Sequence, residues 1–194
     1  MIGTLPVAWL APLDYRYALD AAMAALAGAD APLVRCNVPE LVGEVQQRLP
    51  DQVAQTAHGA LWVEPLAATW RADLDVLAGA LPGGAPLAIV VSRPLARLLP
   101  ERRAWGGRPL GLLPGGLARL RRALPQAGFA LEASHGVHTP VAIGLNIASR
   151  LAERWGRPDL GDRLHVAARL RYGTQGPLAA LSTVALLIAR KERG

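Results

Sequence analysis

The sequence predicts an α/β fold, in which a mostly parallel sheet lies between layers of helices. Short apolar runs alternate with longer segments whose apolar residues recur at helical spacing, and this alternation is typical of layered α/β domains. The run PLAIVVS (residues 86–92) is apolar up to its last position, as expected for a parallel strand covered on both faces. The chain has 194 residues, of which 52% are hydrophobic and 19% charged, so one globular domain with a sizeable core is expected.

The first third of the chain predicts two strands, each followed by a helix. LPVAWLAP (residues 5–12) predicts the first strand, and Asp14 is placed to cap the helix that follows it. PLVRCNV (residues 32–38) predicts the second strand. Asn37 stands at the end of this strand and is placed to cap the next helix. Pro39 would fall in the first turn of that helix, where its missing N–H costs little.

The middle of the chain predicts a strand, a helix and another strand in turn. GALWVEPL (residues 59–66) is apolar over most of its length and predicts the first of these strands. Thr69 can open the helix, and Pro82-Gly83-Gly84 ends it and turns the chain into PLAIVVS. Because a strand and not a helix follows these glycines, they are poorly placed to bind a phosphate.

The remainder of the chain predicts an irregular segment, three helices and two strands. Residues 93–116 are rich in Arg, Pro and Gly and predict a surface excursion. A short basic helix should follow at residues 116–124, and FALEASHGV (residues 129–137) predicts a strand. Two helices are expected within residues 141–172, and LSTVALLIARKE (residues 181–192) predicts the closing strand.

The positive charge of the chain is almost entirely arginine. The net charge is +6, and eight arginines lie between Arg93 and Arg122. This stretch can be a solvated basic surface or a site for nucleic acid. Few aromatic residues and no nucleic-acid-binding motif accompany it, so we expect no nucleic-acid partner. The single cysteine, Cys36, excludes an intrachain disulfide and a cysteine-rich zinc site.

The sequence predicts a soluble, cytoplasmic protein. The first residues, MIGTLPVAWLAP, lack the basic start of a signal peptide and contain two prolines. The longest apolar run, near residues 178–189, contains Ser182 and Thr183 and is too short to cross a bilayer. We therefore expect no membrane partner.

From residue 59 onward, the order of elements resembles the second half of the class I S-adenosylmethionine-dependent methyltransferases. In that family a strand, a helix and an LPGG turn lead into a central strand, as in GALWVEPLAATWRADLDVLAGALPGGAPLAIVVS. The family then has a helix, the phrase AGF before a strand, an insertion and an antiparallel closing strand. LARLRRALPQAGFALEASHG and LSTVALLIARKE are similar to these later pieces.

The resemblance implies a three-layer, Rossmann-like methyltransferase sheet, mostly parallel, with an antiparallel C-terminal strand. It implies a single methyltransferase-like domain over residues 1–194. Residues 1–58 would be a degenerate cofactor half. Residues 59–194 would be the family-like half, with a helical insertion at about residues 141–172.

The N-terminal part departs from the family at the cofactor loop. The family's first strand ends in an acidic residue and a G-x-G loop, because a Cβ there would occupy the space of the ligand. Here the expected strand ends in LAPLDYRY, and no glycine lies between Thr4 and Ala27. If cofactor binding is retained, the resemblance gives the acidic position to Asp14. It gives the ribose-binding position, at the end of the second strand, to Asn37.

Three functional hypotheses remain open. The bulky residues at the cofactor loop predict that S-adenosylmethionine binding is lost. The chain would then be a pseudoenzyme without a cofactor, acting as a binding or structural subunit with a protein partner or as a homo-oligomer. The alternative is an active S-adenosylmethionine-dependent small-molecule methyltransferase with an unconventional cofactor loop. A third hypothesis is a binder of nucleic acid or another anionic surface through the arginines of residues 93–122.

Glu64 and His138 are the candidate catalytic residues of the methyltransferase hypothesis. Glu64 and Ser92 are expected at the carboxyl ends of parallel strands, where open α/β sheets bind ligands. Glu64 can face a substrate, or it can cap the next helix or pair with an arginine. His138, which forms H-x-x-H with His135, is the general base that the resemblance implies. The two histidines can also be a hydrogen-bonded loop pair. No third ligand follows from the spacing, so no metal is expected.

Overall fold

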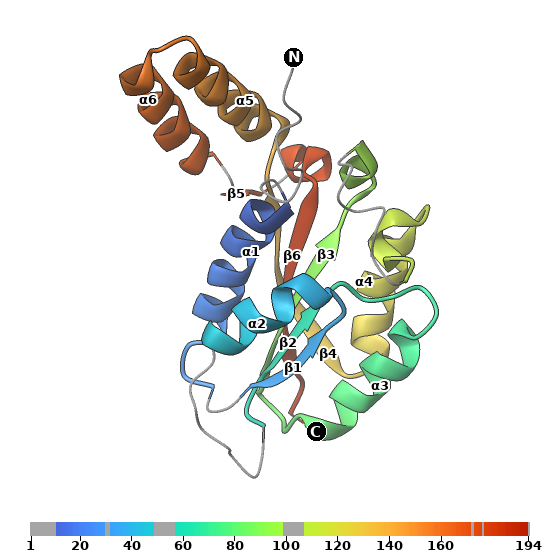
Figure 1. Ribbon diagram of the computed structural model, residues 1–194. Coiled ribbons are helices and arrows are strands. Elements are labelled where there is room, and N and C mark those ends of the chain that lie inside the picture. The colour runs from blue at the N-terminus through green and yellow to red at the C-terminus, as the bar shows by residue number, and fades with distance from the viewer. Residues whose placement is uncertain are drawn as a thin grey trace.

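The strands of the protein form one continuous sheet. The computed structural model describes residues 11–29, 32–48, 57–98, 107–171, 173–175 and 177–193. The six strands follow the spatial order β1-β2-β3-β6-β4-β5 (Figure 1). In chain order they are β1 (Leu33–Cys36), β2 (Ala60–Val63), β3 (Pro86–Ser92), β4 (Phe129–Val137), β5 (Gly173–Thr174) and β6 (Val184–Lys191).

The directions of the strands confirm the predicted α/β class. β1, β2 and β3 are parallel neighbours. β6 runs antiparallel to both β3 and β4, and the short β5 runs antiparallel to β4. Because β6 lies between β3 and β4, the closing strand is inside the sheet and not at its edge. The sheet is therefore mostly parallel with an antiparallel C-terminal strand, as expected.

Helices cover both faces of the sheet and form the outer layers (Figure 1). Alternate residues of a strand point to opposite layers. In β2, Leu61 and Val63 pack in the core beneath α1 and α2, whereas Ala60 and Trp62 pack in the core beneath α3 and α4. This is the expected three-layer arrangement. The helices are α1 (Ala11–Ala25), α2 (Pro39–Arg48), α3 (Trp70–Ala80), α4 (Gly116–Gln126), α5 (Pro140–Arg154) and α6 (Pro158–Arg169).

β1 forms one edge of the sheet, and an ion pair connects it to α3. Arg35 of β1 lies in register with Trp62, and its guanidinium pairs with the carboxylate of Asp73, whose side chain is 3% exposed. The hydroxyl of Thr69 donates to the other carboxylate oxygen of Asp73 at 2.9 Å. Among the described residues, no strand lies beyond β1.

The prediction of a strand at residues 5–12 is wrong at the residues that the structure describes. Residues 5–10 of that prediction lie outside the described residues, and Ala11 and Pro12 belong to α1. Proline is well tolerated in the first turn of a helix, so the two prolines of LPVAWLAP did not exclude helix there. Asp14 therefore lies inside a helix and not at the tip of a strand. Within the part of the chain that the structure describes, the first parallel strand of the sheet is β1.

The segment after β3 is not wholly a surface excursion, contrary to expectation. It contains short 3-10 helices at η2 (Pro94–Leu98) and η4 (Leu110–Leu112), while residues 99–106 lie outside the described residues. Leu110 is buried, and a Cβ on Gly111 would lie 1.8 Å from the backbone oxygen of Ser92. η4 therefore packs directly on the end of β3, and only glycine allows this approach.

α5 and α6 form a hairpin that projects from one end of the molecule (Figure 1). Small residues make the contact between the two helices. The Ser149 hydroxyl donates to the backbone oxygen of Gly161 at 2.7 Å, and Ala152 and Ala168 are buried. The larger apolar side chains of the hairpin are consequently left on its outside. No helix in the described ranges combines the length and the apolar character that a membrane crossing requires.

Candidate functional site

The carboxyl ends of the three parallel strands are tied together by hydrogen bonds. Asp14, Asn37, Glu64 and Ser92 were all expected at this edge: Asn37 follows β1, Glu64 follows β2 and Ser92 ends β3, whereas Asp14 lies within α1. The Asn37 side-chain amide donates to the backbone oxygen of Glu64 at 2.9 Å. Oε1 of Glu64 accepts from the backbone N–H of Ser92 at 2.5 Å. Side chains and backbone of the protein therefore occupy this edge.

Glu64 turns inward and is fully buried. Its φ of 53° lies in the left-handed region, which is costly for a residue other than glycine. The chain leaves Glu64 through Pro65, whose oxygen accepts from the N–H of Leu110 at 2.7 Å. The N-cap of α3 is Thr69, so Glu64 does not cap that helix. The hydrogen bond that this carboxylate accepts from Ser92 joins the end of β2 to the end of β3.

The connection from β1 to α2 stands where a methyltransferase-like sheet would carry its glycine loop. It consists of Asn37 and Val38 alone, neither of which is acidic or a glycine. Val38 is 2% exposed and belongs to the core beneath α1 and α2. Val38 is therefore a buried, branched residue at a position where the resemblance implies a glycine. Asn37 thus stands at the tip of the first parallel strand, not the second as expected.

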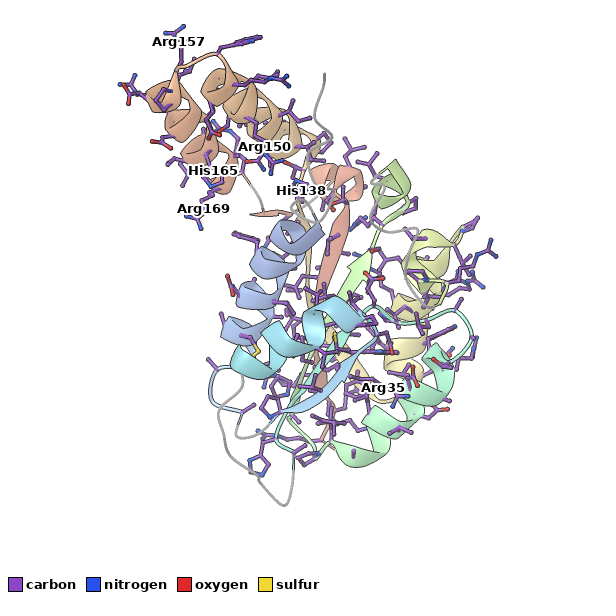
Figure 2. The ribbon with its side chains drawn as sticks, viewed as in Figure 1. Arg35, His138, Arg150, Arg157, His165 and Arg169 are labelled. Atoms are coloured by element: carbon purple, nitrogen blue, oxygen red, sulfur yellow. The ribbon has the colours of Figure 1, made fainter. Side chains whose placement is uncertain are left out.

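The two histidines of H-x-x-H bond to different partners. His135 lies in β4, and its Nδ1 is 3.1 Å from the side-chain amide of Gln175. His138 is 5% exposed, has a φ of 59°, and places Nδ1 3.2 Å from the Thr183 hydroxyl near the base of the hairpin (Figure 2). In the part of the chain that the structure describes, no three His, Cys, Asp or Glu residues form a group that could hold a metal ion.

Arg93, after β3, and Arg121, on α4, take positions that sequence reasoning missed. Arg93 directly follows β3 and is 8% exposed, although the sequence predicts a solvated basic surface there. Arg121 of α4 donates to the Ser134 hydroxyl of β4. Burial, and then the positive charge of Arg121, lower the pKa of Arg93 below its ordinary value. The signal in the sequence was the apolar strand directly before Arg93, but arginine alone rarely indicates burial.

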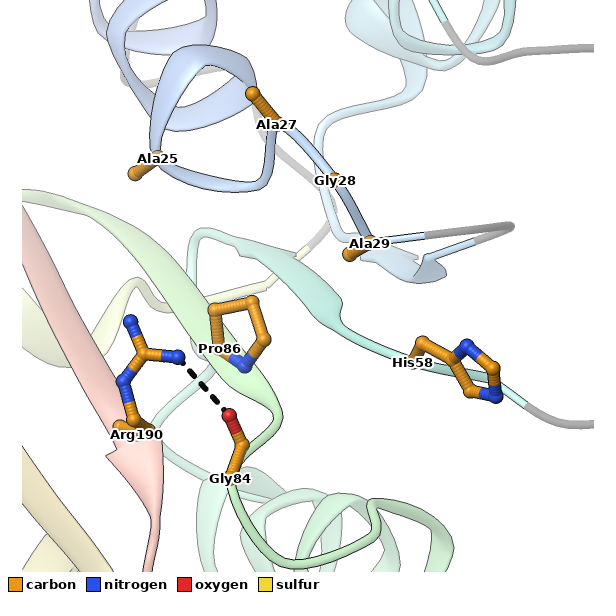
Figure 3. A pocket seen from close by; sticks show the side chains of 8 residues that line it. All are labelled: Ala25, Ala27, Gly28, Ala29, His58, Gly84, Pro86 and Arg190. Atoms are coloured by element: carbon orange, nitrogen blue, oxygen red, sulfur yellow. Dashed lines mark hydrogen bonds between the residues drawn. The ribbon is translucent and has the colours of Figure 1, made fainter.

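Two hollows in the described surface lie away from the strand tips. One, of about 250 Å³, is at the amino ends of the parallel strands (Figure 3). Its lining includes Arg190, which donates to the Gly84 oxygen at 3.0 Å and pairs with Glu132 at 2.6 Å. The other, of about 390 Å³, lies at the turn between α5 and α6 and includes Arg157 and Arg163. Neither hollow is lined by Asp14, Asn37, Glu64 or His138.

No protein-family model and no curated protein matches the sequence. Three solved structures are similar to the chain. The cyclase SpnF is 17% identical over 78% of this chain, with a TM-score of 0.39. A protein from Bacillus halodurans C-125 that is provisionally named a methyltransferase is 13% identical over 90% of this chain, with a TM-score of 0.46. The O-MT segment of StiE is 13% identical over 78% of this chain, with a TM-score of 0.28.

The chain spans 60% of SpnF, 98% of the Bacillus halodurans protein and 53% of the StiE segment. At these identities and TM-scores the likenesses carry no information on activity. The sheet has an antiparallel closing strand, β6, between the parallel strands β3 and β4. This topology agrees with the three-layer, Rossmann-like sheet that the resemblance implies.

Proposed function

We propose that this protein is a binding subunit built on a methyltransferase-like sheet that does not bind S-adenosylmethionine. The observation that carries the proposal is the closed edge of the sheet. The Asn37–Glu64–Ser92 hydrogen bonds and the buried Val38 occupy the place where open α/β sheets receive their ligands. In this proposal Glu64 and His138 have structural and not catalytic roles.

Titration with S-adenosylhomocysteine tests the closed edge directly. We expect no change in melting temperature at millimolar S-adenosylhomocysteine, and no heat of binding for S-adenosylmethionine by calorimetry. A ligand present at a hundred times its Kd would add about 2.7 kcal/mol of stability, so true binding would be visible. A saturable rise in melting temperature would overturn the proposal and favour the active methyltransferase. Asp14, Asn37, Glu64 and His138 would then be the residues to substitute.

The α5–α6 hairpin supplies a surface for association. Ile147 and Leu151 are spaced four residues apart on one face of α5, and Trp155, which directly follows this helix, is 73% exposed. On α6, Val166 and Leu170 are likewise exposed and four residues apart. These side chains are free of the interhelical contact, which uses small residues. Contiguous exposed apolar side chains are typical of protein–protein contacts.

We propose that a second copy of this chain covers Ile147, Leu151 and Trp155, the exposed apolar side chains on the outer side of α5. Arginines and acidic residues alternate around this face, as in Glu153-Arg154 and Asp162-Arg163, so two copies can bring opposite charges together. Figure 2 shows Arg150 and Arg157 on the projecting hairpin, away from the sheet. In this proposal the α5–α6 hairpin is the surface through which the homo-oligomer forms.

Trp155→Ser should weaken self-association by at least about tenfold, because exposed Trp residues often dominate the energy of an interface. The measurement is the molar mass by light scattering over a dilution series. Val76→Ser is the matched control, since Val76 is 56% exposed on α3, away from the hairpin. A wild-type protein that is monomeric at all concentrations, or equal effects of the two substitutions, would contradict this assignment.

A further inference from the structure

We propose that the C-terminal end of α6 binds the surface of a membrane that contains anionic phospholipids. The binding surface, which we call the α6 surface, consists of Arg163, Val166, Arg169, Leu170 and Arg171. The proposed second copy covers side chains on α5, so the α6 surface is separate from that contact. The proposal therefore goes beyond the binding-subunit function and does not depend on it.

Two apolar side chains of the α6 surface are exposed to water. Val166 is 56% exposed, and Leu170 is 78% exposed. The N–H of Leu170 donates to the backbone oxygen of Val166 at 3.1 Å, and Leu170 keeps a helical conformation, so the two side chains lie on the same side. The residues that α6 buries are small, namely Gly161 and Ala168. The two larger side chains therefore form an apolar pair on the outside of the hairpin.

Three exposed arginines surround this apolar pair. One precedes Val166 by a helical turn, and the other two flank Leu170 in the sequence. The sequence contains no acidic residue between Asp162 and Glu192. None of the ion pairs found between described residues involves the three arginines. Figure 2 shows Arg169 at the end of α6, with its side chain projecting from the hairpin. The local charge of the α6 surface is therefore positive.

The combination of arginines with exposed apolar residues favours an anionic membrane surface as the partner. Guanidinium groups bind phosphate oxygens, and their long aliphatic stems let them stay at the headgroups while shorter apolar side chains enter the boundary of the acyl chains. Anionic lipids attract a basic surface to the same place. A nucleic acid would bind the arginines alone and would leave Val166 and Leu170 in water.

The sequence-based expectation of no membrane partner concerned a different mode of binding. It rested on apolar runs that are too short to cross a bilayer. A protein that lies on the surface of a membrane needs no spanning helix, because only part of one face enters the lipid.

Sedimentation with lipid vesicles tests the proposal on the full chain. The vesicles consist of phosphatidylcholine, with or without about one third phosphatidylserine. We expect binding to the vesicles with phosphatidylserine to saturate with lipid concentration and to weaken with added salt. Binding to phosphatidylcholine alone should be at least about tenfold weaker, because the arginines then lack anionic partners. Absence of binding to both kinds of vesicle, or equal binding to both, would overturn the proposal.

Val166→Ser should weaken binding to the anionic vesicles by about threefold or more, because it removes an apolar side chain from the contact. Val76→Ser is the matched control, since Val76 is also 56% exposed and lies on α3, away from the hairpin. Both positions are exposed, so both variants should keep the melting temperature of the wild type. Equal vesicle binding by the two variants would show that charge alone attracts the protein, and would overturn the proposal.

Arg169→Gln should weaken binding to the anionic vesicles by about fivefold, which is the effect of one basic residue at such a surface. Arg122→Gln is the matched control. Arg122 is exposed on α4 and donates to the backbone oxygen of Ala118 in its own helix at 3.3 Å. Its substitution removes the same charge and should change binding by less than about twofold. Equal losses would indicate attraction by the net charge of +6 as a whole and would overturn the assignment to α6.

Competition with soluble polyanions separates a membrane from other anionic partners. Double-stranded DNA and polyglutamate are added to the anionic vesicles at an equal concentration of negative charge. We expect most of the bound protein to stay on the vesicles, because neither polymer offers an apolar phase to Val166 and Leu170. Displacement of most of the protein by DNA would assign the α6 surface to nucleic acid, and displacement by polyglutamate would assign it to an acidic protein. Either result would overturn the proposal.

Discussion

Gly111→Ala is expected to lower the free energy of unfolding by about 3 kcal/mol. The new Cβ would lie 1.8 Å from the backbone oxygen of Ser92 and 2.5 Å from Cγ1 of Val91. A backbone oxygen in a paired strand cannot rotate out of the way, so either η4 or the end of β3 must move. Urea denaturation followed by circular dichroism measures the loss, with an unchanged m-value indicating that only stability has changed.

The control for this prediction is Gly144→Ala. Gly144 lies on α5, and an added Cβ would have no neighbour within 4 Å. Alanine favours a helix over glycine by up to about 1 kcal/mol, so this variant should be as stable as the wild type or more stable. If Gly111→Ala is tolerated as well as Gly144→Ala, then η4 does not pack on β3 as closely as described.

Glu64→Ala is expected to lower the free energy of unfolding by about 2 to 4 kcal/mol. The substitution leaves the buried N–H of Ser92 without the carboxylate oxygen that accepts from it at 2.5 Å. It also leaves a cavity where a fully buried side chain was. Because the backbone keeps a φ of 53° at this position, alanine has the same strain as glutamate and gains nothing from the change.

Glu64→Gln separates the structural role of this residue from a catalytic one. Glutamine keeps an oxygen that can accept from Ser92, so most of the stability should remain, with a loss of about 1 kcal/mol. Denaturant midpoints of the two variants give the comparison. If Glu64→Ala is as stable as the wild type, the carboxylate does not hold β2 to β3, and the interpretation of Glu64 as a substrate-facing residue would be favoured.

β3 and β4 were predictable because the residues of each favour a strand locally and also fit the packing of the sheet. PLAIVVS and FALEASHGV became β3 and β4 with the expected bounds. The N-terminal strand was a wrong prediction at Ala11 and Pro12, because a proline-containing apolar segment is compatible with both a strand end and a first helical turn. Because of that error, the cofactor loop was expected at Asp14. The corresponding place in the structure is the connection after β1.

The candidate site was predictable only in part. Parallel strands bring their carboxyl ends to one edge, so Asn37, Glu64 and Ser92 were correctly placed together. The inward turn of Glu64 depends on a left-handed backbone conformation, which a glutamate in a sequence does not predict. Arg93 is buried at the end of β3, where η4 packs against Ser92, and this packing joins residues far apart in the sequence.

The edge position of β1 bears on whether the sheet can grow by adding strands from other chains. An exposed edge strand offers backbone N–H and C=O groups that can template further chains, as in amyloid growth. β1 is four residues long, and among the described residues nothing pairs with its outer side as a strand. So short a strand leaves few such groups, and the charge of Arg35 interrupts the apolar pattern that a growing fibril needs. The brevity of β1 thereby protects the protein from polymerising through its own sheet.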